Sequence, residues 1–121
     1  MKSILNELLI VEDNTYIRKN IVNALKNSFG EENICQSATL QNATSLLKET
    51  NFKSVILDLA LPDGNGVEML KVLKKQEVKS RVYVFSMNIE LKQLCLKYGA
   101  TAFFDKTKDF DKLIESILKP N

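Results

Sequence analysis

Five polar residues stand at or just after the ends of short apolar runs, where a buried strand would finish. Glu12 and Asp13 follow the first run, Asp58 the third, Ser86 the fourth and Lys106 the fifth. An unpaired carboxylate is costly to bury, so an acid at the end of a core strand needs an explanation. Each residue alone is typical of a helix cap or a solvated loop, but their shared position indicates one site.

These residue types favour phosphoryl transfer. Three clustered carboxylates repel one another, so their pKa values rise or a cation joins them. Ligands that are all oxygen suit Mg²⁺, which keeps several waters and shares phosphate oxygens. A carboxylate beside Mg²⁺ and an ammonium group can attack a phosphoryl group, while the protein positions that group and neutralises its charge. We therefore predict that Asp58 is phosphorylated, with Lys106 and the Ser86 hydroxyl as its partners.

The elements that must position these residues alternate in type along the chain. The apolar runs are Leu8–Val11, Ile34–Ser37, Val55–Leu57, Val82–Phe85 and Ala102–Phe104. Residues at helical spacing follow each run: Ile17, Ile21, Val22 and Leu25; Leu40, Ala43, Leu46 and Leu47; Val67, Leu70 and Leu73; Ile89, Leu91 and Leu94; Leu113, Ile114, Ile117 and Leu118. The fourth helix is expected to end at Gly99, because glycine commonly terminates helices.

This order, strand then helix five times over, predicts an α/β fold. Continuous apolar strands separated by helices are typical of a parallel sheet with helices on both faces, and right-handed crossovers make it doubly wound. Ligands of such sheets bind beyond the carboxyl ends of the strands. The five polar residues fall at that edge.

Composition limits the classes of protein. The chain has 121 residues, 45% of them hydrophobic and 26% charged, which predicts a single soluble domain over 1–121. It has no histidine, which excludes Ser-His-Asp and Cys-His catalysis, a histidine-based zinc site and a phosphohistidine on this chain. Cys35 and Cys95 lack the spacing of a metal or redox motif, and we expect reduced thiols.

Charge and hydropathy also bear on partners and location. The net charge is +2, and the lysines are spread over the helices, so we expect solvated faces and no direct nucleic-acid contact. Near the N-terminus only four consecutive apolar residues, Leu8–Val11, precede the first acids. This pattern predicts neither a signal peptide nor a membrane span, and a cytoplasmic protein is the default expectation.

Four motifs, in this order and at these spacings, resemble the receiver domain of two-component response regulators over essentially the whole chain. They are LLIVEDN (8–14), VILDLALPDGNG (55–66), VYVFSM (82–87) and GATAFFDK (99–106). The resemblance implies a flavodoxin-like sheet ordered 2-1-3-4-5 and a signalling domain switched by phosphorylation. It implies a histidine kinase or phosphotransfer protein as donor, and slow autodephosphorylation without turnover of an external substrate.

The resemblance also implies a metal site. Asp58 matches the phosphoacceptor, and Glu12 and Asp13 match the acidic pair that holds Mg²⁺, with Asp13 favoured as the direct ligand. Ala60 matches the position whose backbone carbonyl binds the metal, within a loop that continues through 62–66. Glutamate at position 12, in place of a second aspartate, keeps the charge of the pair.

A switch is implied by the same comparison. Ser86 matches the hydroxyl residue that bonds the phosphoryl group, Lys106 the lysine of the site, and Phe103 the aromatic residue that turns inward when Ser86 moves. Phe103 and Phe104 are consecutive in a strand and so point to opposite faces, which makes at least one of them core. Thr107 stands where many relatives have proline, and we expect a trans bond before it.

Three other interpretations stay open. A phosphatase of the haloacid dehalogenase type needs a second aspartate two residues after Asp58, where Ala60 stands. A flavodoxin-type flavin carrier needs a phosphate loop rich in Ser, Thr and Gly after the first strand, where the chain has residues 14–16, Asn-Thr-Tyr. A receiver-like module that binds partners without phosphorylation would not need the full set of site residues.

The output of the domain is expected to be contact with another protein or with a separate output domain. The predicted last helix is followed closely by Asn121, with no DNA-binding or catalytic motif after it. We therefore expect no direct binding of nucleic acid or membrane by this chain.

Overall fold

A parallel sheet forms the centre of the computed structural model, which describes the backbone of residues 3–119 and the side chains of residues 7–119. Its strands are β1 (Ser3–Val11), β2 (Ile34–Ser37), β3 (Thr50–Leu57), β6 (Arg81–Ser86) and β7 (Ala102–Asp105). They lie in the order β2-β1-β3-β6-β7, with every neighbouring pair parallel. This confirms the predicted order 2-1-3-4-5. Residues 1, 2, 120 and 121 of the predicted domain lie outside the described residues.

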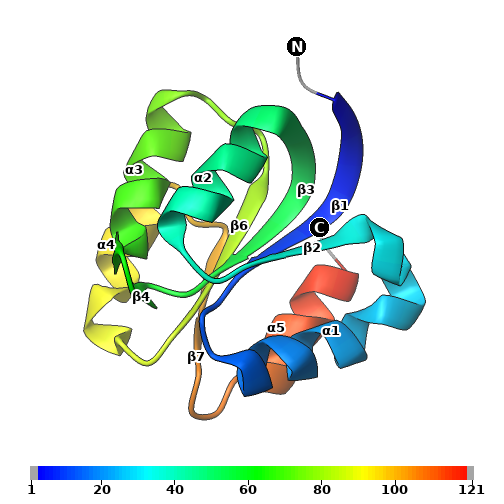
Figure 1. Cartoon of the computed structure of the whole chain (residues 1–121). Coiled ribbons are helices and arrows are strands. Elements are labelled where there is room, and N and C mark those ends of the chain that lie inside the picture. The colour runs from blue at the N-terminus through cyan, green and yellow to red at the C-terminus, as the bar shows by residue number, and fades with distance from the viewer. Residues whose placement is uncertain (1–2, 120–121) are drawn as a thin grey trace.

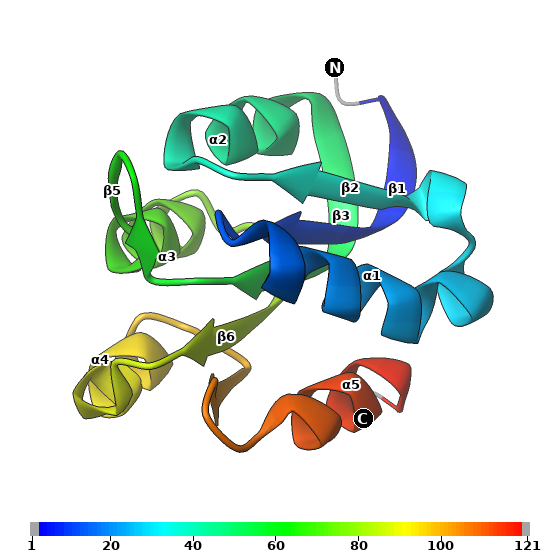
Figure 2. The same ribbon diagram turned by 60° about the horizontal axis from the view of Figure 1, so that its bottom comes forward.

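Helices cover both faces of the sheet, as Figures 1 and 2 show. They are α1 (Thr15–Phe29), α2 (Leu40–Glu49), α3 (Gly66–Lys75), α4 (Lys92–Lys97) and α5 (Phe110–Leu118), with 3₁₀ turns η1 (Glu31–Asn33) and η2 (Ile89–Leu91). Helices α1 and α5 lie on one face, and α2, α3 and α4 on the other. Within the described part of the chain, none of the helices has the length and apolar character needed to cross a bilayer.

The covering of both faces explains the continuous apolar runs. In β1, Leu8 and Ile10 pack into the cluster beneath α1 and α5, whereas Leu9 and Val11 pack into the cluster beneath α2, α3 and α4. All four side chains are fully buried. A strand with a core on each side has no solvent face, so it has no position for a polar residue until it ends.

Strands β1 and β3 begin earlier than the apolar runs predicted. Their backbones pair from Ser3 and Thr50 onward, with a register shift between Ser3 and Asn6. The early part of β3 alternates between buried and exposed residues: Phe52 is buried and Lys53 is exposed. This half-exposed segment has the two-residue period of a strand, but it contains no continuous apolar run.

The inward face predicted for the fourth helix is wrong. Ile89 and Leu94 were expected in the core, but 57% and 36% of their surfaces are exposed, and Cys95 is the buried residue. The reason is the 3₁₀ turn η2, which has three residues per turn and so breaks the 3.6-residue period. Gly99 is confirmed as the residue that ends this helix, with φ of +94° and its N–H donating to the Leu96 carbonyl.

The loop after β3 folds into a two-residue hairpin before α3. Its strands are β4 (Ala60–Leu61) and β5 (Gly64–Asn65). At the start of α3, a Cβ on Gly66 would lie 2.6 Å from the backbone oxygen of Asp58, a separation too short for any side chain. Glycine at this position therefore lets the loop fold back against the end of β3.

The hairpin is fastened to the start of α2. Asp63 accepts two hydrogen bonds from that helix, from the N–H of Leu40 at 2.8 Å and from the N–H of Gln41 at 2.9 Å. Thr39 caps the next free N–H group, that of Asn42, at 3.1 Å. Because helix N-termini have unpaired donors and a partial positive charge, a carboxylate from a neighbouring loop satisfies both requirements.

Candidate functional site

The carboxyl ends of β1 and β3 lie side by side and bring three acids together. Val11 pairs with Leu57 as the last register position of the two strands, and the N–H of Asp58 donates to the Val11 carbonyl at 2.9 Å. Carboxylate oxygens of Glu12, Asp13 and Asp58 all lie within 4.8 Å of one another. The clustering that the strand ends predicted is therefore present in the fold.

The three acids differ in their exposure to water. Glu12 and Asp58 are buried, with 1% and 4% of their surfaces exposed, whereas Asp13 is exposed. Burial, aided by the charge of Asp58, raises the pKa of Glu12 above its ordinary value of 4.5. Two contacts act in the other direction: the Lys106 ammonium, and the N–H of Asn14, which donates to Glu12 Oε2 at 3.1 Å.

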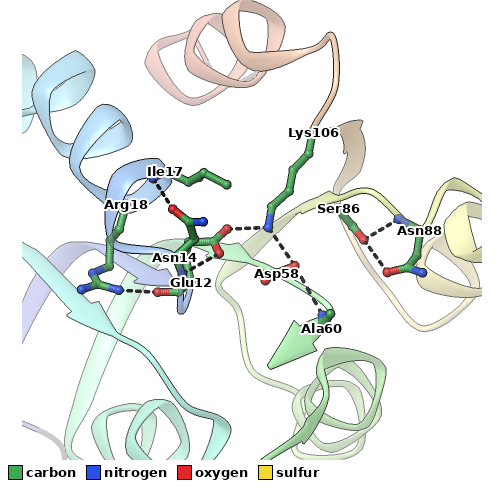
Figure 3. A network of polar contacts seen from close by, with 9 residues as sticks. All are labelled: Glu12, Asn14, Ile17, Arg18, Asp58, Ala60, Ser86, Asn88 and Lys106. Atoms are coloured by element: carbon green, nitrogen blue, oxygen red, sulfur yellow. Dashed lines mark hydrogen bonds and ion pairs between the residues drawn. The ribbon is translucent and has the colours of Figure 1, made fainter. Parts of the chain in front are cut away.

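Lys106 supplies the positive charge at this cluster. Its Nζ lies 2.8 Å from Glu12 Oε1 and 3.2 Å from Asp58 Oδ1. Both contacts are drawn as dashed lines in Figure 3. The backbone is placed by pairing with β6, because the N–H of Lys106 donates to the Ser86 carbonyl at 3.0 Å. Only 11% of the lysine side chain is exposed, so the ion pairs are little screened by water.

The donor set of the cluster fits a hard divalent cation. Glu12, Asp13 and Asp58 offer carboxylate oxygens, which Mg²⁺ prefers to nitrogen or sulfur. The exposed position of Asp13 leaves one side open to water, and Mg²⁺ in proteins usually keeps several waters. Ala60 follows directly in the loop, and its N–H donates to Asp58 Oδ1 at 3.3 Å. The residues present therefore suit Mg²⁺.

Ser86 is buried at the end of β6 and is already hydrogen-bonded. The N–H of Asn88 donates to Ser86 Oγ at 2.9 Å, and Oγ donates in turn to Asn88 Oδ1 at 3.5 Å. Figure 3 shows the hydroxyl turned toward Asn88 and away from Asp58. Ser86 therefore ends a strand at the same edge of the sheet as the acids, with its hydroxyl bonded to Asn88.

The two phenylalanines of β7 point to opposite faces, as expected. Phe104 is buried in the cluster beneath α1 and α5, whereas Phe103 is half-buried and packs against the cluster on the other face. The Phe103 ring is therefore partly exposed and partly in contact with the core. In the described residues every peptide bond is trans, including the bond between Lys106 and Thr107.

Three polar residues of the site region were missed by sequence reasoning. Asn14 caps α1 through its Oδ1, which accepts from the N–H of Ile17 at 3.0 Å, and its own N–H binds Glu12. Arg18 contacts the Glu12 backbone, and Asn88 binds Ser86. All three lie within a few residues of an identified site residue, and an asparagine directly before a helical period is a recognisable cap signal.

Comparison with known proteins shows which sequences and structures this chain is similar to. A family model described as the response regulator receiver domain matches residues 8–118. The cell cycle response regulator CtrA of Brucella ovis is 32% identical over 113 residues, covering 91% of this chain and 47% of that protein. The chain therefore spans about half the length of the curated relatives it matches.

Solved structures share the fold. The signal receiver domain of a LuxO-type repressor protein from Vibrio parahaemolyticus superposes with a TM-score of 0.83 at 23% identity, covering 93% of this chain and 87% of that chain. The beryllofluoride-activated NtrC4 receiver domain dimer has a TM-score of 0.78 at 26% identity, with 92% of each chain covered. These matches favour the receiver interpretation and lend no support to a phosphatase or a flavin carrier.

Proposed function

The chain belongs to the response regulator receiver domain family, and we propose that Asp58 is the residue through which it accepts a phosphoryl group. The donor is a phosphohistidine on a histidine kinase or a phosphotransfer protein. The single observation that carries this assignment is the Lys106 ammonium, which bridges Glu12 and Asp58 at the carboxyl edge of the sheet. A buried acid with a lysine at one oxygen is arranged as a nucleophile beside a charge stabiliser.

The reaction uses the two oxygens of Asp58 differently. Oδ1 accepts from Lys106 and from the Ala60 N–H, so the other oxygen, Oδ2, attacks phosphorus. The new O–P bond forms as the P–N bond to the donor imidazole breaks, and the imidazole nitrogen keeps the electron pair. The product is an aspartyl phosphate. Water later attacks the same phosphorus, the Asp58 O–P bond breaks, and inorganic phosphate leaves, which restores the carboxylate. The domain thus slowly removes its own signal without turning over an external substrate.

The remaining site residues hold the transferred group. Asp13, Glu12, Asp58 and the Ala60 carbonyl would hold Mg²⁺, which would neutralise charge on the phosphoryl oxygens. Lys106 stays beside the acceptor and compensates the negative charge that the transfer adds. These roles are the ones that the resemblance to other receivers implies for Glu12, Asp13, Asp58, Ala60 and Lys106.

Phosphorylation is read out by Ser86 and Phe103. The Ser86 hydroxyl exchanges its contact with Asn88 for a phosphoryl oxygen, and the half-buried ring of Phe103 turns into the space that becomes free. This rearrangement changes the surface around the ends of β6 and β7. The output is altered binding of a protein partner or an output domain in the cytoplasm, and the proposal assigns no nucleic-acid or membrane contact to this chain.

The test is chemical labelling followed by intact mass spectrometry. Acetyl phosphate with Mg²⁺ should add one phosphoryl group to the protein, and excess EDTA should prevent the addition. Asp58→Asn should abolish it, whereas Asp111→Asn, a matched change at an exposed position in the first turn of α5, should leave it unchanged. Label that persists in Asp58→Asn, or that forms equally well in EDTA, would contradict the assignment.

A second measurement distinguishes a domain switched by phosphorylation from a receiver-like module that binds partners without phosphorylation. Beryllofluoride mimics a bound phosphoryl group without covalent chemistry. Its addition should shift the amide NMR signals of Ser86, Asn88 and Phe103 in the wild-type protein and leave them unchanged in Asp58→Asn. Binding without any change at these three residues would mean that the site is occupied but not read out.

A further inference from the structure

Arg18 of α1 ties the end of β1 to the neighbouring strand β2. Its Nη1 donates to the backbone carbonyl of Glu12 at 2.6 Å, and its Nε donates to Gln36 Oε1 at 3.0 Å. Figure 3 shows the guanidinium beside the Glu12 backbone, on the side away from Lys106. The arginine is half-buried and binds the backbone of Glu12, whereas Lys106 binds the carboxylates of Glu12 and Asp58.

With the Arg18 contact, every polar group of Glu12 has a hydrogen-bond or ion-pair partner. The N–H of Glu12 donates to the Ser37 carbonyl at 2.9 Å, and both carboxylate oxygens have partners, Lys106 at Oε1 and the Asn14 N–H at Oε2. Arg18 binds the one remaining group, the carbonyl. A residue whose donors and acceptors are all bonded cannot rotate without breaking at least one of these bonds.

Fixing this carbonyl also fixes Asp13. The Glu12 carbonyl belongs to the planar peptide unit that joins Glu12 to Asp13. The direction of this carbonyl therefore sets the orientation of the peptide plane to which Asp13 is attached. Asp13 is exposed, and its carboxylate is held near the other two acids by the backbone. We infer that Arg18 is a positioning residue: by orienting the Glu12–Asp13 peptide it holds the Asp13 carboxylate in place for Mg²⁺.

The shape of arginine matters as much as its charge. A guanidinium presents several N–H groups in a rigid, planar fork, so two acceptors on separate segments of the chain hold it in one orientation. Gln36 is the second of these acceptors, on β2. A lysine could reach the carbonyl with one ammonium hydrogen, but it would lack the second bond that fixes its direction. The inference depends on the proposed function in one respect, namely that the cation bound by the acids is Mg²⁺.

Removal of Arg18 has two opposite effects on Mg²⁺ binding, which makes the test informative. Loss of a positive charge near three carboxylates favours Mg²⁺ binding, because the cation meets less repulsion. Loss of the peptide orientation disfavours Mg²⁺ binding, because Asp13 is no longer held at its position. If Arg18 acts by positioning, the second effect dominates, and the Mg²⁺ affinity falls.

The experiment is titration of the unphosphorylated protein with Mg²⁺ by calorimetry. Arg18→Ala should raise the Mg²⁺ Kd about tenfold, the scale found when a residue that orients a metal ligand is removed. Arg18→Lys should show part of the loss although it keeps the charge, and Gln36→Leu should show a smaller loss in the same direction. Lys19→Ala, which removes an equal charge from an exposed neighbour on α1, should leave the Kd unchanged or slightly lower.

The same variants should separate metal binding from chemistry in the acetyl phosphate reaction. The Mg²⁺ concentration needed for half-maximal labelling should rise with the Kd, while the labelling rate at saturating Mg²⁺ stays within about twofold of wild type. Thermal unfolding of each variant checks that the fold is kept, and if Arg18→Ala does not fold, Arg18→Lys and Gln36→Leu decide the question.

Three outcomes would overturn the inference. One is an unchanged or tighter Mg²⁺ Kd in Arg18→Ala, and another is full rescue by lysine, which would show that charge alone matters. The third is a loss of labelling rate that saturating Mg²⁺ does not restore. Each is distinct from failure of the proposed function, in which the wild-type protein itself would not be labelled at Asp58.

Discussion

Lys106 Nζ lies 3.2 Å from Asp58 Oδ1, although the strands that carry the two residues are separated by β6. The lysine stem reaches over the end of that intervening strand, and its ammonium also binds Glu12. One cation thus compensates two buried carboxylates. The acidic cluster would otherwise be a strong repulsive feature within the fold.

Replacement of Lys106 by methionine should therefore weaken the fold as well as abolish labelling of Asp58. Methionine keeps an apolar stem but leaves Glu12 and Asp58 without their cation, and we expect the free energy of unfolding to fall by about 3 kcal/mol near neutral pH. The loss should shrink as the pH is lowered, because Glu12, whose pKa is already raised by burial, then takes up a proton.

Urea unfolding at several pH values measures this effect. Lys112→Met is the matched control, since the Lys112 side chain on α5 is 77% exposed and its ion pair with Asp109 is long, at 3.9 Å. The control should change stability by less than about 0.5 kcal/mol. An equal loss in the two variants, or a Lys106→Met penalty that does not depend on pH, would show that Lys106 does not compensate the acids.

Neutralisation of Asp13 should have the opposite effect on stability. Its exposed carboxylate lies within 4.8 Å of two others, and Asp13→Asn removes that repulsion, worth about 1 kcal/mol between charges this far apart in a solvated setting. The gain in unfolding free energy should be largest at low ionic strength and should shrink in about 1 M NaCl, where charges are screened. A gain that is independent of salt would point to a cause other than repulsion, and Asp111→Asn should show no gain.

Any side chain at position 66 should disturb Asp58. In Gly66→Ala the new Cβ would meet the Asp58 carbonyl at 2.6 Å, so the end of β3 or the start of α3 must shift. We expect a loss of about 1–3 kcal/mol, the usual cost of overpacking, and slower labelling of Asp58 in the molecules that remain folded.

Gly99→Ala is the matched comparison for this variant. Its Cβ would have open space, but the residue has φ of +94°, so the substitution strains the backbone far from the acids. It should lower stability without slowing the labelling of folded protein. If both variants label at the wild-type rate, the close approach of Gly66 does not position Asp58.

The bond between Asp63 and α2 should make stability depend on pH. Hydrogen bonds from the N–H groups of Leu40 and Gln41 hold the pKa of Asp63 below its ordinary value of 3.8. A carboxyl group whose pKa is lower in the folded than in the unfolded state stabilises the fold at pH values above the unfolded-state pKa. This stabilisation is lost as the pH falls through the folded-state pKa. Asp63→Asn should therefore melt at a lower temperature than wild type at neutral pH, and the two melting temperatures should converge in acid. A constant difference at all pH values would contradict the role of the carboxylate charge.

Most of the sheet and the acidic cluster could be predicted from the sequence, because both follow from local signals. Strands buried on two faces leave continuous apolar runs, and the first polar residue after each run marks an edge of the sheet. The contact between Lys106 and Asp58 follows once the strand order is known. The start of β3 was missed because its half-exposed first residues contain no such run.

The supporting contacts could not be predicted in the same way. Arg18, Asp63 and Asn88 bind backbone groups or side chains whose positions depend on how the loops fold together. A backbone carbonyl or N–H has no residue type, so no pattern of letters marks it as a partner. The buried face of the fourth helix was misassigned for a related reason, since the 3₁₀ turn that changes its phase has no clear sequence signal.

The reach of Lys106 over β6 also sets an order of events during synthesis on the ribosome. The three acids belong to the first half of the chain, whereas their cation follows β7, close to the end of the matched domain. A nascent chain that has not yet released β7 from the exit tunnel holds Glu12 and Asp58 without a compensating charge. Under the proposed function, such a chain would lack the lysine that completes the acceptor site.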